Sequence, residues 1–296
     1  MDAKDLELII NLCNYSTADA EFLSSKLEIT PDNVERRIAL LKRSGIIKGF
    51  SAFFDRRMFG YDTTYLKLHY RMRDLDRIIE DVSSMPQVAQ VYPNLDDFMM
   101  VEVVHWDMDT LKSVIRAVER IAKPMTVSTH FRPMLPDNIP EAPRGKDLEI
   151  LKYLVKDGRA TPEDLSGLVK LKPEKVSERI SKMINQEVFT VRPVIQEDLV
   201  QPFPTFSTIV TFGKGSPFST CYSETQRIGK GIWSCMPLEE PPGIWMRSFG
   251  KDLHEMDTMI ERYRREGFAD DVLVIIPDTM VVKRTVDLNI LKNAGK

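Results

Sequence analysis

The sequence predicts an α+β fold in which two winged helix-turn-helix domains alternate with two ferredoxin-like βαββαβ domains. Three observations predict it: three short helical patterns and a strand open the chain, a β-α-β-β-α-β order follows, and the whole series then begins again. The expected domains are winged helix-turn-helix 1 (1–58), ferredoxin-like domain 1 (59–134), a proline-rich linker (135–146), winged helix-turn-helix 2 (147–200), ferredoxin-like domain 2 (201–286) and an exposed tail (287–296).

Helical periodicity and end signals define the first domain. Residues 3–13 and 20–27 are expected to form two short helices, and 30–48 a third helix with its turn and a strand start. Thr30 can cap this third helix, and Val34, Ile38 and Leu41 recur at helical spacing as a buried stripe. Gly45 lies just past the end of the helix, where glycine tolerates a left-handed stop. Residues 46–55 alternate loosely and are expected to form a wing hairpin.

From residue 63 the hydrophobic pattern alternates as in a strand, which marks the first strand of ferredoxin-like domain 1. Its predicted strands are 63–72, 88–92, 98–106 and 125–132, and its predicted helices are 75–85 and 108–122. In the second domain of this kind the predicted strands are 205–212, 232–237, 244–249 and 272–277, and the predicted helices are 217–228 and 253–266.

The repeat is visible residue by residue with a constant offset of about 142 positions and no gap across the helix-turn-helix. It aligns Asp5 with Asp147, Pro31 with Pro173, Val34 with Val176, Arg37 with Arg179 and Ile38 with Ile180. Two units of this length, each with a complete core pattern, indicate a duplicated two-domain protein rather than a solenoid.

Composition permits ordinary globular cores, with 43% hydrophobic residues and a net charge of −3. A nucleic-acid-binding protein with this charge must concentrate its basic residues locally. Three cysteines without Cys-x-x-Cys spacing predict neither a disulfide framework nor a cysteine metal site, and they favour a reducing, cytoplasmic setting. No apolar run is long enough to span a bilayer, and no signal peptide opens the chain.

The stretches DLELIINL (5–12), TPDNVERRIALLKRSGIIKGFSAFFD (30–55) and FGY (59–61) resemble the Lrp/AsnC family of bacterial and archaeal transcription regulators. Members of this family have a DNA-binding domain followed by a ferredoxin-like RAM domain, which dimerises and often binds a small effector such as an amino acid. The resemblance therefore implies a non-enzymatic, double-stranded DNA-binding regulator, here in a duplicated form typical of archaea.

The third helix is the candidate recognition helix, because Arg36 and Arg43 lie opposite its buried stripe. Asp32 and Asn33 lie where base edges are reached, although Asp32 can instead complement the helix dipole. Arg37 lies beside the core stripe, where a structural ion pair and a phosphate contact are both open. The candidate DNA-binding residues of this domain are Thr30, Asp32, Asn33, Arg36, Arg37, Lys42, Arg43 and Lys48.

The second recognition helix has lost the outward arginines, since Glu178 replaces Arg36 and Asn185 replaces Arg43. It keeps the candidate phosphate contacts Lys172, Lys175 and Lys182. The sequence leaves open whether this copy adds backbone affinity or serves as scaffold.

The effector site departs from the family pattern. Its candidates are Asn94, Asp96 and Asp97. The family usually carries a Gly-Asp turn there, and the glycine is absent from this chain. The corresponding stretch of the second half, 237–245, has neither the glycine nor the aspartate in register. The open face of the first sheet is too apolar for solvent (Tyr65, Lys67, His69, Met100, Val104, Trp106 and His130). Either the second half covers it as an intrachain pseudo-dimer, or a homodimer holds four winged helices. A homodimer predicts palindromic sites, and a lone pseudo-dimer predicts an asymmetric one.

Two rival functions remain on the same scaffold. Siroheme decarboxylases share it and do not bind DNA, but residues 91–103 lack the histidine and arginine their active half offers, and Arg247 has no histidine nearby. A protein-interaction module with an inactive helix-turn-helix is the other. Strand parity places His105 on the opposite face from His69 and His130, so neither a metal nor another cofactor is expected.

Overall fold

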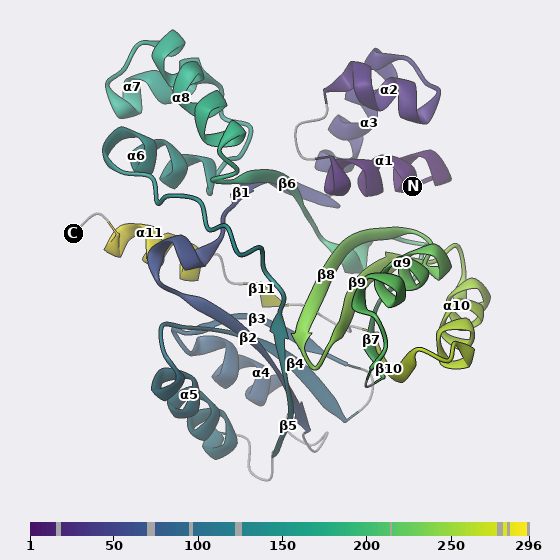
Figure 1. The fold of residues 1–296 in the computed structure, drawn as a ribbon. Coiled ribbons are helices and arrows are strands. Elements are labelled where there is room, and N and C mark those ends of the chain that lie inside the picture. The colour runs from purple at the N-terminus through teal and green to yellow at the C-terminus, as the bar shows by residue number, and fades with distance from the viewer. Residues whose placement is uncertain are drawn as a thin grey trace. The chain divides into compact units, whose positions relative to one another are not determined.

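The computed structural model describes residues 1–15, 19–69, 75–94, 97–121, 126–213, 215–276, 281–282 and 285–294. The chain forms two compact units (Figure 1), which we call the winged-helix unit (1–60, 137–199 and 287–296) and the sheet unit (61–136 and 200–286). Among the helices in these ranges, none combines the length and the apolar character that crossing a membrane requires.

Two sets of three helices build the winged-helix unit. The first set is α1 (Ala3–Asn14), α2 (Ala20–Leu27) and α3 (Pro31–Arg43), and the second is α6 (Gly145–Leu154), α7 (Pro162–Val169) and α8 (Pro173–Asn185). The side chains of Asp2, Asp19, Thr30 and Thr161 cap four of these helices by accepting backbone N–H groups, which such residues do well at this position. The helices lie where periodicity and end signals predict them.

The expected wing hairpin is wrong. Strand β1 (Ile47–Phe53) pairs instead with β6 (Thr190–Ile195) of the second copy, and the chain after β1 enters a 3-10 turn, η1 (Arg56–Phe59), rather than folding back. The antiparallel register pairs Phe50 with Pro193 and Ser51 with Arg192. Because the repeat aligns Phe50 with Arg192 and Ser51 with Pro193, the two strands are related by a local pseudo-twofold axis.

Strand β1 also packs into the core of the second copy. Ala52 is buried against the cluster that contains Leu151 and Val176, and Ser51 Oγ donates a hydrogen bond to the carbonyl of Val155 (2.8 Å). The N–H of Gly158 donates to the carbonyl of Phe50 (2.8 Å). The two winged helices are therefore interlocked into one body.

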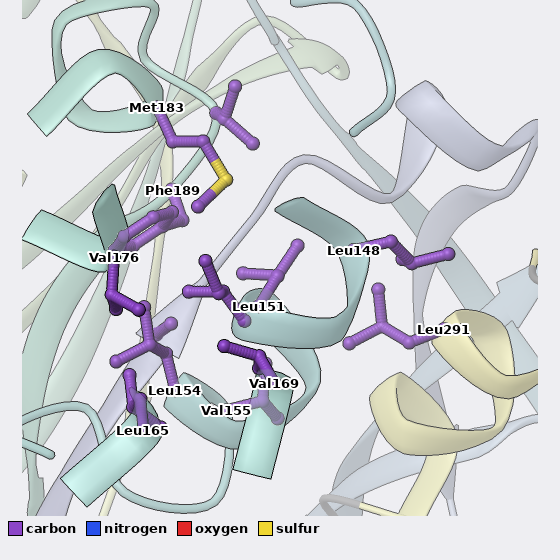
Figure 2. Packing of buried hydrophobic residues seen from close by; sticks show 13 residues of the cluster. Leu148, Leu151, Leu154, Val155, Leu165, Val169, Val176, Met183, Phe189 and Leu291 are labelled. Carbon is purple, nitrogen blue, oxygen red and sulfur yellow. The ribbon is translucent and has the colours of Figure 1, made fainter. Parts of the chain in front are cut away.

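The C-terminal residues are not an exposed tail, as the sequence suggested. They form helix α11 (Thr285–Asn293), in which Leu291 is fully buried beside Leu148 (Figure 2). Arg56 Nε donates to Asp287 (2.7 Å). The helix carries leucines at 288 and 291 that sequence reasoning did not assign to a core, and burying them against α6 stabilises this position.

The sheet unit contains both βαββαβ domains. The first consists of β2 (Asp62–His69), α4 (Leu75–Ser84), β3 (Val88–Pro93), β4 (Phe98–His105), α5 (Met108–Ile121) and β5 (Thr126–Pro133). The second consists of β7 (Thr205–Phe212), α9 (Phe218–Ile228), β8 (Ile232–Glu240), β9 (Gly243–Phe249), α10 (Leu253–Arg265) and β10 (Ala269–Ile275); a short 3-10 turn η3 (Glu197–Leu199) precedes it and β11 (Val281–Val282) follows it.

Strand pairing joins the two domains into one nine-stranded sheet with the order β10-β7-β9-β8-β5-β2-β4-β3-β11. The joint is formed by β5 and β8, where Arg132 is paired with Glu240. At the far end, β11 follows β10 along the chain but pairs with β3 of the first domain. The first domain thus gains a strand from the segment that follows the second, and the pairing of β5 with β8 ties the two halves together.

The faces of the sheet that carry no helices pack on each other. Their apolar cluster joins Met100 and Phe131 of the first half to Ile209 and Leu238 of the second, and Trp245 lies between them. The Trp245 ring stacks edge-to-face with Tyr65 (4.8 Å between centroids) and Tyr92 (5.6 Å). The second half of the same chain therefore covers much of the open face, while Trp106 and His130 remain exposed.

Candidate nucleic-acid interface

Helix α3 is held at its start and along one side. Thr30 Oγ1 accepts the N–H of Asn33 (3.3 Å), and Pro31 occupies the first turn, where its missing N–H costs nothing. Val34, Ile38 and Leu41 are buried. The opposite surface of the helix must therefore face outward.

That outward surface carries Asp32, Arg36, Leu40 and Arg43, all exposed. Neither Arg36 nor Arg43 forms a hydrogen bond or ion pair with any of the described residues. Two guanidinium forks on one helix face are suited to phosphate oxygens or to the O6 and N7 atoms of guanine. Leu40 is 48% exposed, and an apolar side chain at such a position suits contact with a thymine methyl group. Sequence reasoning did not single it out, although its helical position opposite the buried stripe could have identified it, as it identified the two arginines.

Arg37 belongs to a different network. Its Nη1 atom donates to Asp5 (2.6 Å) and Asp2 (2.9 Å), and its Nε donates to Asn33 (3.1 Å). These contacts fix α3 to α1 and raise the pKa of the guanidinium, chiefly through the hydrogen bond to Asp5. The second copy repeats the pair between Arg179 and Asp147 (2.7 Å). Of the two roles that the sequence left open for Arg37, the structural one is present.

The two remaining candidate cations of the first copy are Lys42 on α3 and Lys48 on β1. Lys48 is exposed on β1, and the Lys42 ammonium lies over the Phe50 ring (5.3 Å). The guanidinium of Arg159 lies over the same ring at 3.7 Å. Burial there lowers the pKa of Arg159, which nevertheless keeps an exposed portion and stays charged.

Sequence reasoning missed Arg159. It comes from the loop between α6 and α7 of the second copy, and no feature of the sequence places it beside α3. Its repeat-related position is Thr17, so the duplication gave no signal for it. The pairing of β1 with β6 is what brings it to the first copy.

The outward surface of α8 has another chemistry. Lys172 and Lys182 are exposed, and Lys172 caps the helix without a side-chain hydrogen bond. Lys175 Nζ donates to Glu178 (2.5 Å), and this hydrogen bond lowers the pKa of the Glu178 carboxyl. One of the three lysines is therefore paired within its own helix.

Of the predicted effector residues, the two that the structure describes have different surroundings. Asn94 is 4% exposed, and its Oδ1 accepts the backbone N–H of Ile276 (2.7 Å), which gives it a structural role. Asp97 is 74% exposed, and its Oδ1 lies 3.6 Å from His69 Nδ1. Asp96 lies outside the described residues.

Comparison with known proteins shows where this architecture recurs. A family model described as winged helix-turn-helix DNA-binding matches residues 144–190, the second copy. An uncharacterized HTH-type transcriptional regulator of Pyrococcus furiosus is 25% identical over 126 residues, covering 40% of this chain and 81% of the relative. The regulatory protein AsnC of Haemophilus influenzae is 22% identical over 144 residues, covering 46% of this chain and 96% of AsnC. The chain is therefore similar to regulators of the Lrp/AsnC type. One regulator of ordinary length thus corresponds to less than half of this duplicated chain.

A solved structure is similar to this chain over nearly its full length. It is the siroheme decarboxylase NirDL, with a TM-score of 0.57 and 16% identity, and the match covers 98% of this chain and 99% of NirDL. At this identity the match shows a common fold with two copies of each domain, and the fold alone does not assign an activity.

Proposed function

We propose that this protein is a sequence-specific DNA-binding transcription regulator in which α3 reads the major groove. The observation that carries the proposal is the pair of exposed arginines, Arg36 and Arg43, opposite the buried stripe of a helix in a winged helix-turn-helix. HTH-type regulators among the relatives support the same class of function.

Local charge supports the proposal despite the net charge of −3. The exposed Lys48 on β1 and Arg159 over the Phe50 ring are the phosphate contacts that we propose, whereas Arg37 is committed to Asp2 and Asp5. In the second copy Lys172 and Lys182 are exposed in the same way. Phosphate contacts release counterions, so affinity should fall steeply with salt.

Modulation by a small effector and assembly into a homodimer are parts of the proposal that rest on the family resemblance. Asn94 is not among the effector contacts we propose, because its side chain already holds the backbone of Ile276.

Fluorescence anisotropy with the full-length chain tests the proposal. The labelled duplex is the region upstream of its own gene, the competitor is a scrambled duplex of equal length, and the titration is repeated at several salt concentrations. We expect tighter binding to the upstream region at every salt concentration, and affinity for both duplexes should decline as salt rises. Equal affinity for the two duplexes, or no binding to either, would contradict a sequence-specific regulator.

A second candidate, a tetrapyrrole-converting enzyme, is favoured by the full-length similarity to siroheme decarboxylase. Arg247 of β9 adds to it, because its guanidinium lies 4.3 Å from the Trp233 ring and 5.4 Å from the Tyr92 ring. Against it, His105 of β4 contacts Thr64 (2.9 Å) on the helix side rather than facing Arg247. Mixing the protein with siroheme decides the matter: a saturable change in the absorption band would favour the enzyme, and an unchanged spectrum the regulator.

A further inference from the structure

We propose that the DNA target is one-sided: α3 reads base sequence in one half-site, while α8 grips only the sugar–phosphate backbone of the other half. This inference rests on the proposed function and names the class of DNA that such a regulator takes. It follows from a pseudo-symmetric scaffold that carries two unlike recognition helices.

The inferred target requires a scaffold that relates the two helices by symmetry. Strands β1 and β6 pair about a pseudo-twofold axis, as two identical subunits would. The hydrogen bonds from Ser51 to Val155 and from Gly158 to Phe50 fix the copies to each other. In symmetric dimers such an arrangement places the recognition helices in successive major grooves and selects inverted repeats.

The outward positions of the two helices differ in chemistry. Where α3 has Arg36 and Arg43, α8 has Glu178 and Asn185. Where α3 has the exposed Leu40, α8 has Lys182. The planar arginine fork that suits guanine is thus missing from α8 at both positions.

The acidic residue on α8 does not restore base reading. The Glu178 carboxylate is bound by Lys175 at 2.5 Å, so the charge of each is compensated within the helix. The exposed ammonium groups of Lys172 and Lys182 act as point charges without a preferred hydrogen-bonding plane. Contacts of such groups with phosphate oxygens position the protein on the duplex and carry no sequence information.

The neighbouring contacts reinforce the asymmetry. Arg159, which belongs to the second copy, lies over Phe50 beside α3 and adds its charge to the half-site that α3 reads. At the repeat-related position of the first copy the residue is Thr17, which carries no charge. Arg159 of the second copy therefore adds a positive charge beside α3, and its repeat-related residue has no charge to add beside α8.

Selection of bound duplexes from a random-sequence pool by the full-length protein, followed by hydroxyl-radical footprinting, tests the inference. We expect a footprint that spans two half-sites and a selected motif confined to one of them. An inverted repeat with equal information in both halves would overturn the one-sided target and leave the specific regulator standing. A pool without any enriched motif would overturn both.

A gain-of-function variant makes the test sharper. Glu178→Arg with Asn185→Arg gives α8 the arginine pattern of α3, and we expect about tenfold tighter binding to an inverted repeat of the selected half-site than to the one-sided site. Glu80→Arg with Ser113→Arg adds the same charge at exposed positions of the sheet unit and controls for net charge. A double variant that gains no more than this control would contradict the assignment of the asymmetry to these two positions.

Discussion

Arg37 is a basic residue on α3, the proposed recognition helix, and its side chain already binds carboxylates of the protein itself. It is 18% exposed and holds Asp5, which is 16% exposed, across the gap between α3 and α1. Arg36, its neighbour in sequence, points outward without a described partner. Of these adjacent arginines, Arg37 thus holds two helices together, whereas Arg36 is the one that we propose for DNA recognition.

Replacing Arg37 by alanine should therefore affect folding more than binding. Loss of the partly buried ion pair leaves Asp5 uncompensated, and we expect the free energy of unfolding to fall by about 1–3 kcal/mol. Denaturant titration measures this change. Arg179→Ala, at a pair with 40% exposure of the arginine, should cost less. A tenfold loss of DNA affinity by folded Arg37→Ala would show instead that this residue contacts DNA.

His105 gives the sheet unit a predictable response to acid. Burial lowers the pKa of its imidazole, and Nε2 contacts Thr64 Oγ1 at 2.9 Å. The unfolded chain takes up a proton near pH 6.5 and the folded chain resists it, so the free energy of unfolding should decline as pH falls below about 6.5. Denaturation midpoints from pH 7.5 to pH 5 should show this decline, and His105→Gln should flatten it. An equal decline in the variant would assign the acid response to other groups.

The prediction of single residues succeeded where helical geometry alone decides exposure. The outward positions of Arg36 and Arg43 follow from the buried stripe of Val34 and Leu41. Arg159 could not be found in this way, because a contact between residues 50 and 159 depends on how two strands pair. The interaction of Asn94 with Ile276, across 182 positions, was missed for the same reason.

At the level of helices and strands, the paired β1 and β6 are the feature on which the winged-helix unit depends. A Cβ atom on Gly158 would lie 2.8 Å from the backbone of Ser51 and from Val191 Cγ1. The loop can therefore approach β1 closely only with glycine at this position.

Gly158→Ala should push this loop away from β1. We expect destabilisation of about 1–3 kcal/mol, because the hydrogen bond from residue 158 to Phe50 and the close packing are both strained. Gly167→Ala is the matched control: it lies inside α7 with no atom within 4 Å of the added methyl group, and it should be neutral or stabilising by up to about 1 kcal/mol. Thermal melts of the two variants give the comparison, and equal melts would argue against the interlocked strands.

Most element boundaries could be predicted because caps and periodicity are local signals. Helix α2 and strand β7 occupy the predicted residues. The prediction of a wing hairpin was wrong because a strand pattern does not indicate which strand pairs with it. The partner of β1 lies in the other copy of the repeat. Helix α11 was not predicted, because this short segment is helical through the burial of Leu291 rather than through its own helix propensity.

At the level of the whole molecule, the duplication lets one chain form between its two copies the contacts that two subunits of a dimer would form. In the sheet unit, Trp245 and Leu238 of the second half cover the sheet of the first, and in the winged-helix unit β6 pairs with β1. Because both copies lie on one chain, α3 and α8 can differ in sequence at their outward positions. A homodimer of identical chains cannot vary one helix alone.

Measurement of sequence preference in two double variants tests the central claim most directly. Affinities for the upstream duplex and for its scrambled counterpart are compared for the parent chain, for Arg36→Ala with Arg43→Ala on α3, and for Lys182→Ala with Asn185→Ala on α8. We expect the α3 variant to lose at least tenfold of the preference for the upstream duplex, and the α8 variant to bind both duplexes more weakly while keeping the ratio. An α3 variant that keeps the full preference, or an α8 variant that loses it, would contradict α3 as the helix that reads DNA.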